Sequence, residues 1–455
     1  MKIIILGAGQ VGTTLANSLA NELHDITIVD VNHEKLEQLS NRFELRTVTG
    51  RGSYPPILRQ AGIEDTDMLI AVTDSDETNI LACYIAHTYF RTPKRIARIR
   101  SQRYLDEPDF INKLHIDLVI SPEQLVTDSI RNLIEYPGAL HVLDFAEGHL
   151  RLVAFIAYTG GTLVGHTIAT MAEQMPQLKA RVVAIYRHNQ PIKPTGDTLV
   201  AHGDEVFILV ARGDLRELMK VLRRLDKEAK SIIIAGGGNI GKRLALTLEK
   251  QYHVKVIERD RARAAEIYQE FTNAMVLVGD GSDDALLKNE NIASTDIFCA
   301  LTDYDEFNII SAIMAKKMGA KQVMALINRS DFGELFESGY IDIVISPKDA
   351  TLSALLSYVR RGDIENVHTL RNGAAEAIEA IAHGDKNTSK VVGRVIEEIS
   401  LPKGAYIGAI ARGDDVLMAH HDTVIESGDH LVIFLNDKSG IKAIERLFQV
   451  DFTFL

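Results

Sequence analysis

Three glycines near the start of the chain have the spacing of a nucleotide-binding turn. Gly7, Gly9 and Gly12 stand in the stretch GAGQVG. An apolar run over residues 3–6 precedes them, and a segment with the pattern of a helix, 11–20, follows. In such a turn the first glycine permits the tight bend, the second leaves space for a pyrophosphate, and the third lets the helix pack closely on the sheet. The helix N-terminus offers free N–H groups to the phosphates, so the stretch predicts nucleotide binding rather than a simple tight turn.

An acidic residue completes this unit. The next apolar strand, 26–29, ends on Asp30, at the distance from the glycines where a ribose-binding carboxylate is expected. A carboxylate there accepts hydrogen bonds from both ribose hydroxyls and repels a 2′-phosphate. The sequence therefore favours NAD or a related adenine nucleotide over NADP.

The same unit occurs a second time. Gly236, Gly238 and Gly241 repeat the turn 229 residues later, and a strand over 254–257 again ends on an acid, Glu258. The stretch TGRGS returns as VGDGS, and AVTDSDETN returns as ALTDYDEFN, in the same register. Beyond these, SP and GD dipeptides repeat at an offset of 225. The chain is a tandem duplication of about 225 to 229 residues, longer than the repeat of a solenoid.

Each copy divides into two expected domains. Short apolar strands alternate with helices over 1–135 and again over 229–360, which predicts an α/β fold with two doubly wound parallel sheets of the Rossmann type. Each is followed by a small α+β lobe that lacks a glycine phosphate loop, over 136–228 and 361–455. A charged helix over 215–230 is expected to link the two copies.

Further candidate residues follow the other strands, because ligands of such sheets bind outside the carboxyl ends of the strands. Thr73 and Asp74 come after the fourth strand and Arg98 lies near the end of the fifth. The residues predicted to bind nucleotide are Gly7, Ala8, Gly9, Gln10, Val11, Gly12, Asp30, Thr73, Asp74 and Arg98 in the first copy, and Gly236, Gly238, Asn239, Ile240, Gly241, Glu258, Gly279, Asp280 and Thr302 in the second.

Two of these assignments have a structural alternative. Asp74 or Asp76 could simply cap the following helix by accepting its free N–H groups. Arg98 could form a surface ion pair instead of a charge-assisted contact to a phosphate. At the position equivalent to Arg98 the second copy has an apolar residue, Ala325, Leu326 or Ile327, according to the register chosen.

The two sites should therefore treat a polyphosphate differently. We expect the first site to suit ATP or ADP because of Arg98. The second has Glu258 and Asp280 where the first has Asp30 and Arg51, and two carboxylates suit ribose and adenine while disfavouring additional phosphates. The hypothesis is that the second site prefers NAD or NADH. Because Arg51 departs from the more usual Gly-Asp pair, it is left out of the predicted site.

Charge and composition exclude several partners. The formal net charge of −12 disfavours nucleic acid and anionic lipid surfaces. The two cysteines, Cys83 and Cys299, indicate reduced thiols in a cytoplasm rather than a disulfide framework. The first strand follows Met1 at once, leaving no room for a signal sequence, and no stretch is long and apolar enough to span a bilayer. We expect no metal site, because the adjacent pair His420-His421 would point to opposite faces of a strand.

GAGQVG, AVTDSDETN, RIARIRS, LIEYPGAL and the closing LFQVDFTFL together resemble the TrkA family over the full chain. This family supplies the cytoplasmic regulatory subunits of bacterial Trk potassium uptake systems, built from two tandem RCK domains. The resemblance implies an RCK N-lobe and C-lobe, twice, and assembly as a ring, usually a homotetramer. It also implies docking on a TrkH- or TrkG-like potassium channel at the cytoplasmic face of the inner membrane, and gating by NAD or NADH and by ATP or ADP.

The main alternative is an NAD-dependent oxidoreductase, since Rossmann units commonly serve hydride transfer. That reaction needs an acid or base beside the nicotinamide. His188 and Lys193 of the first small lobe are matched by Gly413 and Met418 in the second, so neither residue type is repeated. A redox-sensing transcription regulator would need a helix-turn-helix or a basic patch, and this sequence shows neither. The sequence thus predicts a regulator with no catalytic residue, not an enzyme.

Overall fold

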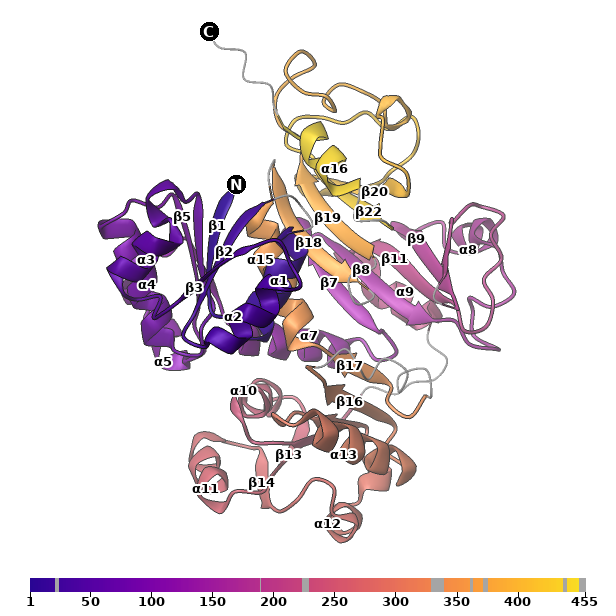
Figure 1. Cartoon of the computed structure of the whole chain (residues 1–455). Coiled ribbons are helices and arrows are strands. Elements are labelled where there is room, and N and C mark those ends of the chain that lie inside the picture. Colours follow the sequence, from indigo (N-terminus) through magenta and orange to yellow (C-terminus); the bar gives the residue numbers. More distant parts are fainter. Residues whose placement is uncertain are drawn as a thin grey trace. The chain divides into compact units, whose positions relative to one another are not determined.

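The chain forms two compact units, each containing one six-stranded parallel sheet (Figure 1). The first unit comprises Met1–Leu125 and Pro347–Tyr358, and the second comprises Val126–Ser346 and Val359–Leu455. This computed structural model describes residues 1–455 apart from 21–23, 189, 223–228, 329–338, 361–362, 371–374, 437–439 and 450–455.

The sheet of the first unit has the strand order β3-β2-β1-β4-β5-β6, which is the order of a doubly wound nucleotide-binding fold. All five pairings are parallel. The strands are β1 Lys2–Leu6, β2 Asp25–Asp30, β3 Arg46–Thr49, β4 Met68–Ala71, β5 Lys94–Arg98 and β6 Leu118–Ile120. The helices are α1 Gln10–Ala20, α2 His33–Ser40, α3 Pro55–Ala61, α4 Asp76–Thr88, α5 Gln102–Leu105 and α6 Pro108–Lys113.

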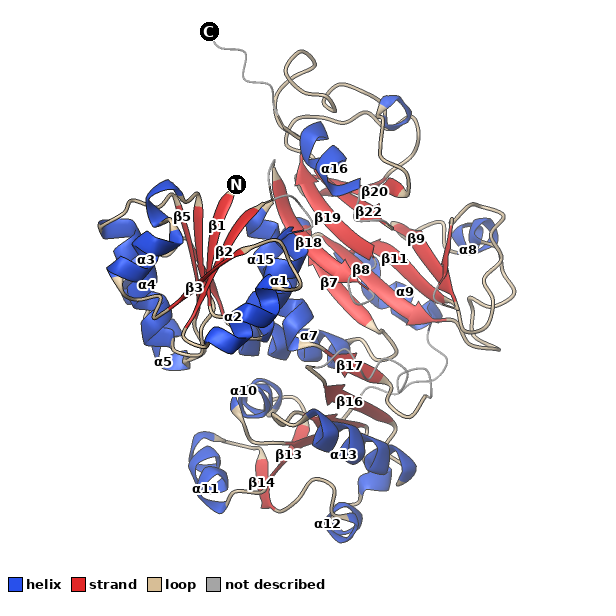
Figure 2. Ribbon diagram, in the orientation of Figure 1, coloured by secondary structure: helices blue, strands red, loops and turns tan. Residues whose placement is uncertain are grey.

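Burial explains why these strands read as continuous apolar runs. Every residue of β4 is buried, and so is β1 after its first residue, because helices cover both faces of the sheet. Figure 2 shows α1 and α2 on one face and α3 and α4 on the other.

The second unit repeats this architecture, with the strand order β14-β13-β12-β15-β16-β17. Its strands are β12 Ser231–Ala235, β13 His253–Glu258, β14 Met275–Val278, β15 Ile297–Ala300, β16 Gln322–Leu326 and β17 Ile343–Ile345. Its helices are α10 Asn239–Leu248, α11 Arg261–Glu270, α12 Asp284–Asn289 and α13 Asp305–Lys317. The predicted fold class is confirmed: two doubly wound parallel sheets, each followed along the chain by an α+β lobe.

Both small lobes are built on five-stranded antiparallel sheets, ordered β10-β9-β11-β8-β7 and β18-β19-β22-β20-β21. The first contains β7 His141–Phe145, β8 Leu150–Ile156, β9 Ala180–Arg187, β10 Gln190–Ile192, β11 Glu205–Ala211, α8 Ile168–Gln174 and α9 Leu215–Leu222. The second contains β18 Ile364–Leu370, β19 Ala375–Ile381, β20 Ala405–Arg412, β21 Asp415–Met418, β22 His430–Leu435 and α16 Ile441–Leu447.

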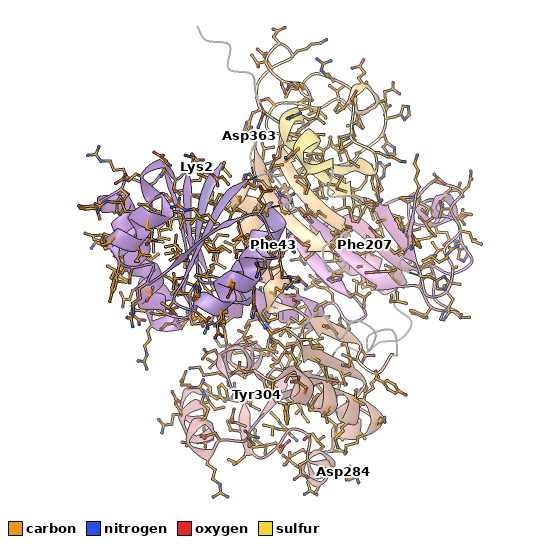
Figure 3. All side chains as sticks on the ribbon, viewed as in Figure 1. Lys2, Phe43, Phe207, Asp284, Tyr304 and Asp363 are labelled. Carbon is orange, nitrogen blue, oxygen red and sulfur yellow. The ribbon has the colours of Figure 1, made fainter. Side chains whose placement is uncertain are left out.

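The two lobe sheets pack on each other through one shared core. Phe207 of the first lobe and Phe434 of the second are both buried, with ring centroids 5.8 Å apart; Phe207 is labelled in Figure 3. The Tyr186 hydroxyl donates a hydrogen bond of 2.8 Å to Asn436 Oδ1 across this interface. A Cβ at Gly408 would lie 2.5 Å from Leu209 Cδ1, so glycine allows the sheets this close approach.

Two helices that follow the parallel sheets are divided between the units. Helix α7, Pro122–Glu135, begins in the first unit, and its residues from Val126 belong to the second. Helix α15, Pro347–Val359, follows the second parallel sheet along the chain, yet its residues up to Tyr358 belong to the first unit. The four-part division at 135, 228 and 360 follows the sequence repeat and stays a prediction.

The predicted linker helix over 215–230 is shorter than expected. Its first part is α9, residues 223–228 lie outside the described residues, and 229 and 230 are not helical. Both cysteines are buried, Cys83 in α4 and Cys299 in β15, and burial raises the pKa of each thiol to about 12.

A partly buried carboxylate joins the starts of β12 and β15 and makes stability depend on pH. Asp296 accepts hydrogen bonds from the backbone N–H groups of Lys230 and Ser231, at 2.7 and 2.9 Å, and from Lys321 Nζ. Burial alone would raise the pKa of this carboxyl, but these donors outweigh burial and lower the pKa to about 2. In the first copy, Asp67 accepts one such bond, from Lys2 N at 2.8 Å.

We expect Asp296→Asn to destabilise the protein by roughly 2 kcal/mol at pH 7. Because the folded pKa is depressed, the stabilisation is complete above pH 4 and is lost as the pH falls towards 2. Thermal unfolding followed by circular dichroism should show the difference from wild type shrinking over that window. Asp67→Asn is the matched control and should cost less; an Asp296→Asn penalty that stays constant down to pH 2 would contradict the assignment.

Candidate functional site

The two glycine turns have nearly the same backbone. Gly7 has φ of 107° and Gly236 has φ of 112°, which side-chain-bearing residues rarely adopt. The N–H of Gly7 donates to Val29 O at 2.8 Å, and that of Gly236 donates to Ile257 O at 2.9 Å. Each turn is thereby tied to the strand that ends on the acidic residue.

The other glycines serve two different purposes. A Cβ at Gly12 would lie 1.9 Å from the carbonyl oxygen of Gly7, so the helix backbone presses against the turn itself. Gly241 stands in the same relation to Gly236. At Gly9 and Gly238, by contrast, a Cβ would meet nothing within 4 Å. The protein does not need glycine at these two positions for its own packing, and the space they leave open is where the sequence predicts a pyrophosphate.

Each acidic residue lies at its turn, as predicted. Asp30 accepts hydrogen bonds from Ala8 N at 2.6 Å and from Asn32 N at 2.8 Å. Glu258 accepts from Gly237 N at 2.9 Å and from Asp260 N at 2.8 Å. The carboxylates thus hold the turns in shape, and a ribose would share or replace these backbone donors.

The remaining turn residues occupy the helix starts. Gln10 and Val11 are the first residues of α1, and Asn239 and Ile240 are the first of α10. Their position at the helix N-termini agrees with the expected phosphate end of a nucleotide.

A buried asparagine organises the neighbouring strand ends in both copies. Asn79 accepts hydrogen bonds from the backbone N–H of Thr73 at 3.0 Å and from its hydroxyl at 2.6 Å. Its amide nitrogen donates to Thr73 O at 3.1 Å and to Arg98 O at 2.9 Å. One side chain therefore joins the carboxyl ends of β4 and β5, and sequence reasoning had not singled it out, although both repeated stretches end on this asparagine.

Asn308 repeats these contacts and settles the register between the copies. It binds Thr302 N and Oγ1, at 2.9 and 2.7 Å, and donates to Thr302 O and Leu326 O, each at 2.8 Å. Asn79 donates to Arg98 O and Asn308 donates to Leu326 O, so Leu326 is the residue of the second copy that is equivalent to Arg98. Ala325 and Ile327 are its neighbours along the chain.

The alternative that Asp74 or Asp76 caps helix α4 is wrong. The side chain of Ser75, not that of Asp74 or Asp76, caps the helix by accepting from Thr78 N at 3.1 Å. Asp76 instead accepts from the backbone N–H groups of Arg100 and Ser101, at 3.0 and 2.8 Å. The side chain of Asp74 is 92% exposed and reaches towards arginines.

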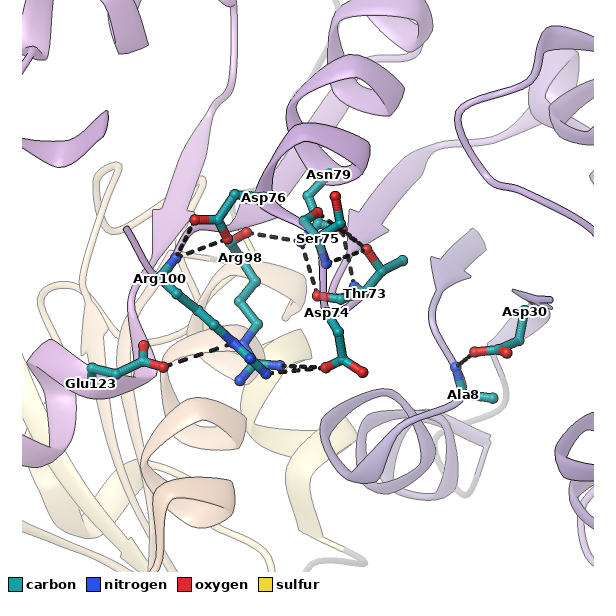
Figure 4. A network of polar contacts seen from close by, with 10 residues as sticks. All are labelled: Ala8, Asp30, Thr73, Asp74, Ser75, Asp76, Asn79, Arg98, Arg100 and Glu123. Atoms are coloured by element: carbon teal, nitrogen blue, oxygen red, sulfur yellow. Dashed lines mark hydrogen bonds and ion pairs between the residues drawn. The ribbon is translucent and has the colours of Figure 1, made fainter. Parts of the chain in front are cut away.

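Arg98 is not a surface residue. Its side chain is 13% exposed, and its Nη1 lies 3.9 Å from Asp74 Oδ1. Its Nε is buried and has no hydrogen-bond partner among the described residues. Burial lowers the pKa of the Arg98 guanidinium, and the nearby charge of Arg100 lowers it further. Figure 4 shows the two guanidinium groups together, with Asp74 on one side and Glu123 on the other.

The second site has no arginine at the positions of Arg98 and Arg100. It has a different cation, Arg263, which the sequence did not predict. Leu326 is buried where Arg98 stands in the first copy. Arg263, near the start of α11, donates from Nε to Gly237 O at 3.2 Å. The N-caps Asn32 and Asp260 align Arg263 with Lys35 of the first copy. Aligning the two copies at these caps could have identified Arg263 from the sequence.

Gly279 and Asp280 lie at the end of β14. The N–H of Gly279 donates to Glu258 O at 3.0 Å, which brings this strand end to the acidic residue. Asp280 Oδ1 accepts from Ser282 N at 2.8 Å and from its hydroxyl at 2.6 Å, so it is engaged within its own loop. In the first copy, Gly50 donates to Asp30 O at 2.9 Å and Arg51 follows.

Neither a metal-binding cluster nor a membrane-spanning helix is found among the described residues. They contain no group of three or more His, Cys, Asp or Glu side chains arranged to hold a metal ion. His420 and His421 follow β21 outside any strand, and His421 begins a turn, which agrees with the expected hairpin end. Within the same described part of the chain, no helix combines the length and the apolar character needed to cross a bilayer.

Comparison with known proteins agrees with the duplicated architecture. The TrkA-N domain model matches residues 3–122 and 232–347, and the TrkA-C domain model matches 152–223 and 386–449. A Trk system potassium uptake protein TrkA from Halomonas elongata is 54% identical over 456 residues, covering 100% of both chains. The protein of the same name from Vibrio alginolyticus is 53% identical over 452 residues, covering 99% of both.

Solved structures show the same fold at low sequence identity. The crystal structure of the GsuK RCK domain has a TM-score of 0.63 at 18% identity, covering 98% of this chain and 94% of that one. The GsuK channel bound to NAD has a TM-score of 0.62 at 17% identity, covering 98% and 78%. With tandem TrkA-N and TrkA-C domains and full-length relatives above 50% identity, this chain belongs to the TrkA family of Trk system potassium uptake proteins.

Proposed function

We propose that this chain is the regulatory subunit of a Trk-type potassium uptake system and gates a TrkH- or TrkG-like channel by changing conformation when nucleotides bind. The observation that carries this proposal is the pair of glycine turns. Each is shaped by its own close packing, yet each leaves an open position, Gly9 or Gly238, beside a helix N-terminus. The names of the relatives supply the potassium system, and the GsuK channel bound to NAD is a protein of the same fold that holds a nucleotide.

The subunit would act from the cytoplasmic face of the inner membrane as a peripheral ring, a homotetramer, attached through its channel partner. Its mechanism needs no catalytic residue, only two conformations that bind nucleotide with different affinity. We therefore propose a regulator and not an oxidoreductase. A difference of a few kcal/mol between the conformations is enough to move most of the population from one to the other.

The two sites would differ in their preferred nucleotide. Arg98, a mostly buried cation with an unpaired Nε, supports binding of ATP or ADP at the first site. At the second site Leu326 removes this cation, which supports NAD or NADH there. Glu258 and Asp30 disfavour the 2′-phosphate of NADP in both. Arg263 is a cation of the second site near the turn, and we include it among the residues that would contact the nucleotide.

Closing each turn separately tests nucleotide binding. We expect Gly9→Glu to abolish binding at the first site and Gly238→Glu to abolish it at the second, because each places a carboxylate where phosphates are proposed. Isothermal titration calorimetry with ATP, ADP, NAD and NADH measures the loss. Gly213→Glu is the matched control, since a Cβ there also meets nothing within 4 Å and the residue lies in a small lobe. Unchanged binding in both site variants would show that the turns are only structural.

Replacing Arg98 tests the assigned preference. We expect Arg98→Leu, which copies the residue of the second site, to weaken ATP binding at the first site about tenfold or more, because a charge-assisted contact is lost. NAD binding at the second site should not change. Arg103→Leu, an exposed position in α5, controls for the loss of charge. Equal effects of both variants on ATP affinity would reject a direct contact of Arg98 with phosphate.

Potassium flux tests the regulatory role. The chain is reconstituted with a TrkH-like channel in vesicles, and flux is measured with and without each nucleotide. We expect nucleotide-dependent flux with the wild type, and loss of the ATP or ADP response with Gly9→Glu. Nucleotide-independent flux with the wild type, or measurable turnover of NADH with a substrate, would favour another function.

A further inference from the structure

A chain of charged side chains in the first copy leads from the proposed phosphate position to helix α7. Arg100 lies between two carboxylates: its Nη2 is 3.1 Å from Asp74 Oδ1, and its Nε is 3.8 Å from Glu123 Oε1. Arg98 joins the same cluster through Asp74. We call these four residues, Asp74, Arg98, Arg100 and Glu123, the charge cluster (Figure 4).

Exposure differs sharply along the charge cluster. The Asp74 side chain is 92% exposed, so water and salt screen its pairs with the arginines. The side chain of Glu123 is 11% exposed, and its attraction to Arg100 is screened much less. Arg100 is thus held by an exposed hydrogen bond to Asp74 and by a less screened attraction to Glu123.

Glu123 is the second residue of α7, and this helix is continuous from Pro122 to Glu135. The compact units divide within it, because residues up to Leu125 belong to the first unit and those from Val126 to the second. A change at Glu123 therefore acts on the first turn of the one helix that leads directly from the first parallel sheet into the following lobe.

The second copy shows that the fold does not require this arrangement. Leu326 replaces Arg98 and Asn328 replaces Arg100, while the repeated Ser-Pro pairs align Glu123 with Lys348. Asn328 instead donates from its backbone and side chain to Asp305, at 3.0 Å each. The second copy thus forms the same strand ends, buried asparagine and helix without counterparts to Arg98, Arg100 and Glu123. Only Asp74 has an acidic counterpart, Asp303.

We propose that the charge cluster couples the first nucleotide site to helix α7. The phosphates of ATP or ADP, held at the turn as proposed above, attract Arg98 and Arg100 and weaken the hold of Arg100 on Glu123, which loosens the first turn of α7. This inference rests on the proposed nucleotide binding. Nucleotide binding at the first site would then be transmitted to α7, the helix that begins at the first Ser-Pro pair. The second site would bind its nucleotide without such a connection to α15.

Competition for the same guanidinium has a reciprocal consequence. If phosphate binding releases Glu123, then removing the Glu123 carboxylate must favour phosphate binding by the same free energy. We expect Glu123→Gln to bind ATP about three- to tenfold more tightly than wild type at the first site, consistent with one partly screened charge pair. A carboxylate that merely supported the fold would lower the affinity or leave it unchanged.

The deciding measurement is hydrogen exchange of the full chain, with and without ATP, read on peptides that cover 121–130. In the wild type we expect ATP to increase exchange in the first turn of α7. In Glu123→Gln this segment should exchange faster already without ATP, and ATP should add little. Lys348→Gln, the matched change in α15, should leave the ATP response of 121–130 unchanged.

The outcomes separate this inference from the function on which it rests. If calorimetry shows that wild type does not bind ATP at the first site, the nucleotide proposal fails. If wild type binds ATP but exchange at 121–130 does not respond, or Glu123→Gln responds like wild type, the coupling is overturned while nucleotide binding stands. Should Glu123→Gln fail to fold, Arg100→Asn, which introduces the residue of the second copy, breaks the same pair and is expected to remove the ATP response.

Discussion

One buried amide in each copy determines where the candidate sites can form. Asn79 satisfies its amide oxygen and nitrogen with backbone groups at the ends of β4 and β5, and Asn308 does the same for β15 and β16. A buried amide that lost these partners would carry a large desolvation cost, so the strand ends are held in one register. Thr73, Asp74 and Arg98 take their positions from this fixed backbone, as do their counterparts in the second copy.

Because the backbone is fixed in this way, the copies could diverge in charge without losing the fold. The turns, the acidic residues and the asparagines are retained, while Arg98 and Arg100 are matched by Leu326 and Asn328. The second turn is also supported differently, since Arg263 contacts the Gly237 carbonyl. Duplication thus gives two sites of one shape with different electrostatics, which is the basis for expecting different nucleotides.

Local spacing was enough to predict the parallel sheets and the residues of both turns. The glycine pattern reflects steric requirements within a few residues, as the contact of Gly12 with Gly7 shows. The sequence could not identify the helix cap, because Ser75, Asp74 and Asp76 are all capable acceptors. Ser75 caps the helix, while Asp76 bonds instead to the backbone at Arg100. The register of Leu326 and the role of Arg263 likewise depend on contacts between distant segments. The packing of Phe207 on Phe434 joins two copies of a lobe and leaves no pattern within either.

The charge balance around Arg98 is the basis for proposing that the candidate phosphate site also acts as a switch. Arg98 and Arg100 contribute two positive charges, and Asp74, Asp76 and Glu123 surround them with three carboxylates. With Asp76 included, a polyphosphate cannot simply add to these five charges, because it would meet an excess of negative charge. It must take the arginines from one of their partners. Asp76 is fixed by backbone N–H groups and Asp74 already lies in water, so the partner whose loss has a structural consequence is Glu123, at the start of α7.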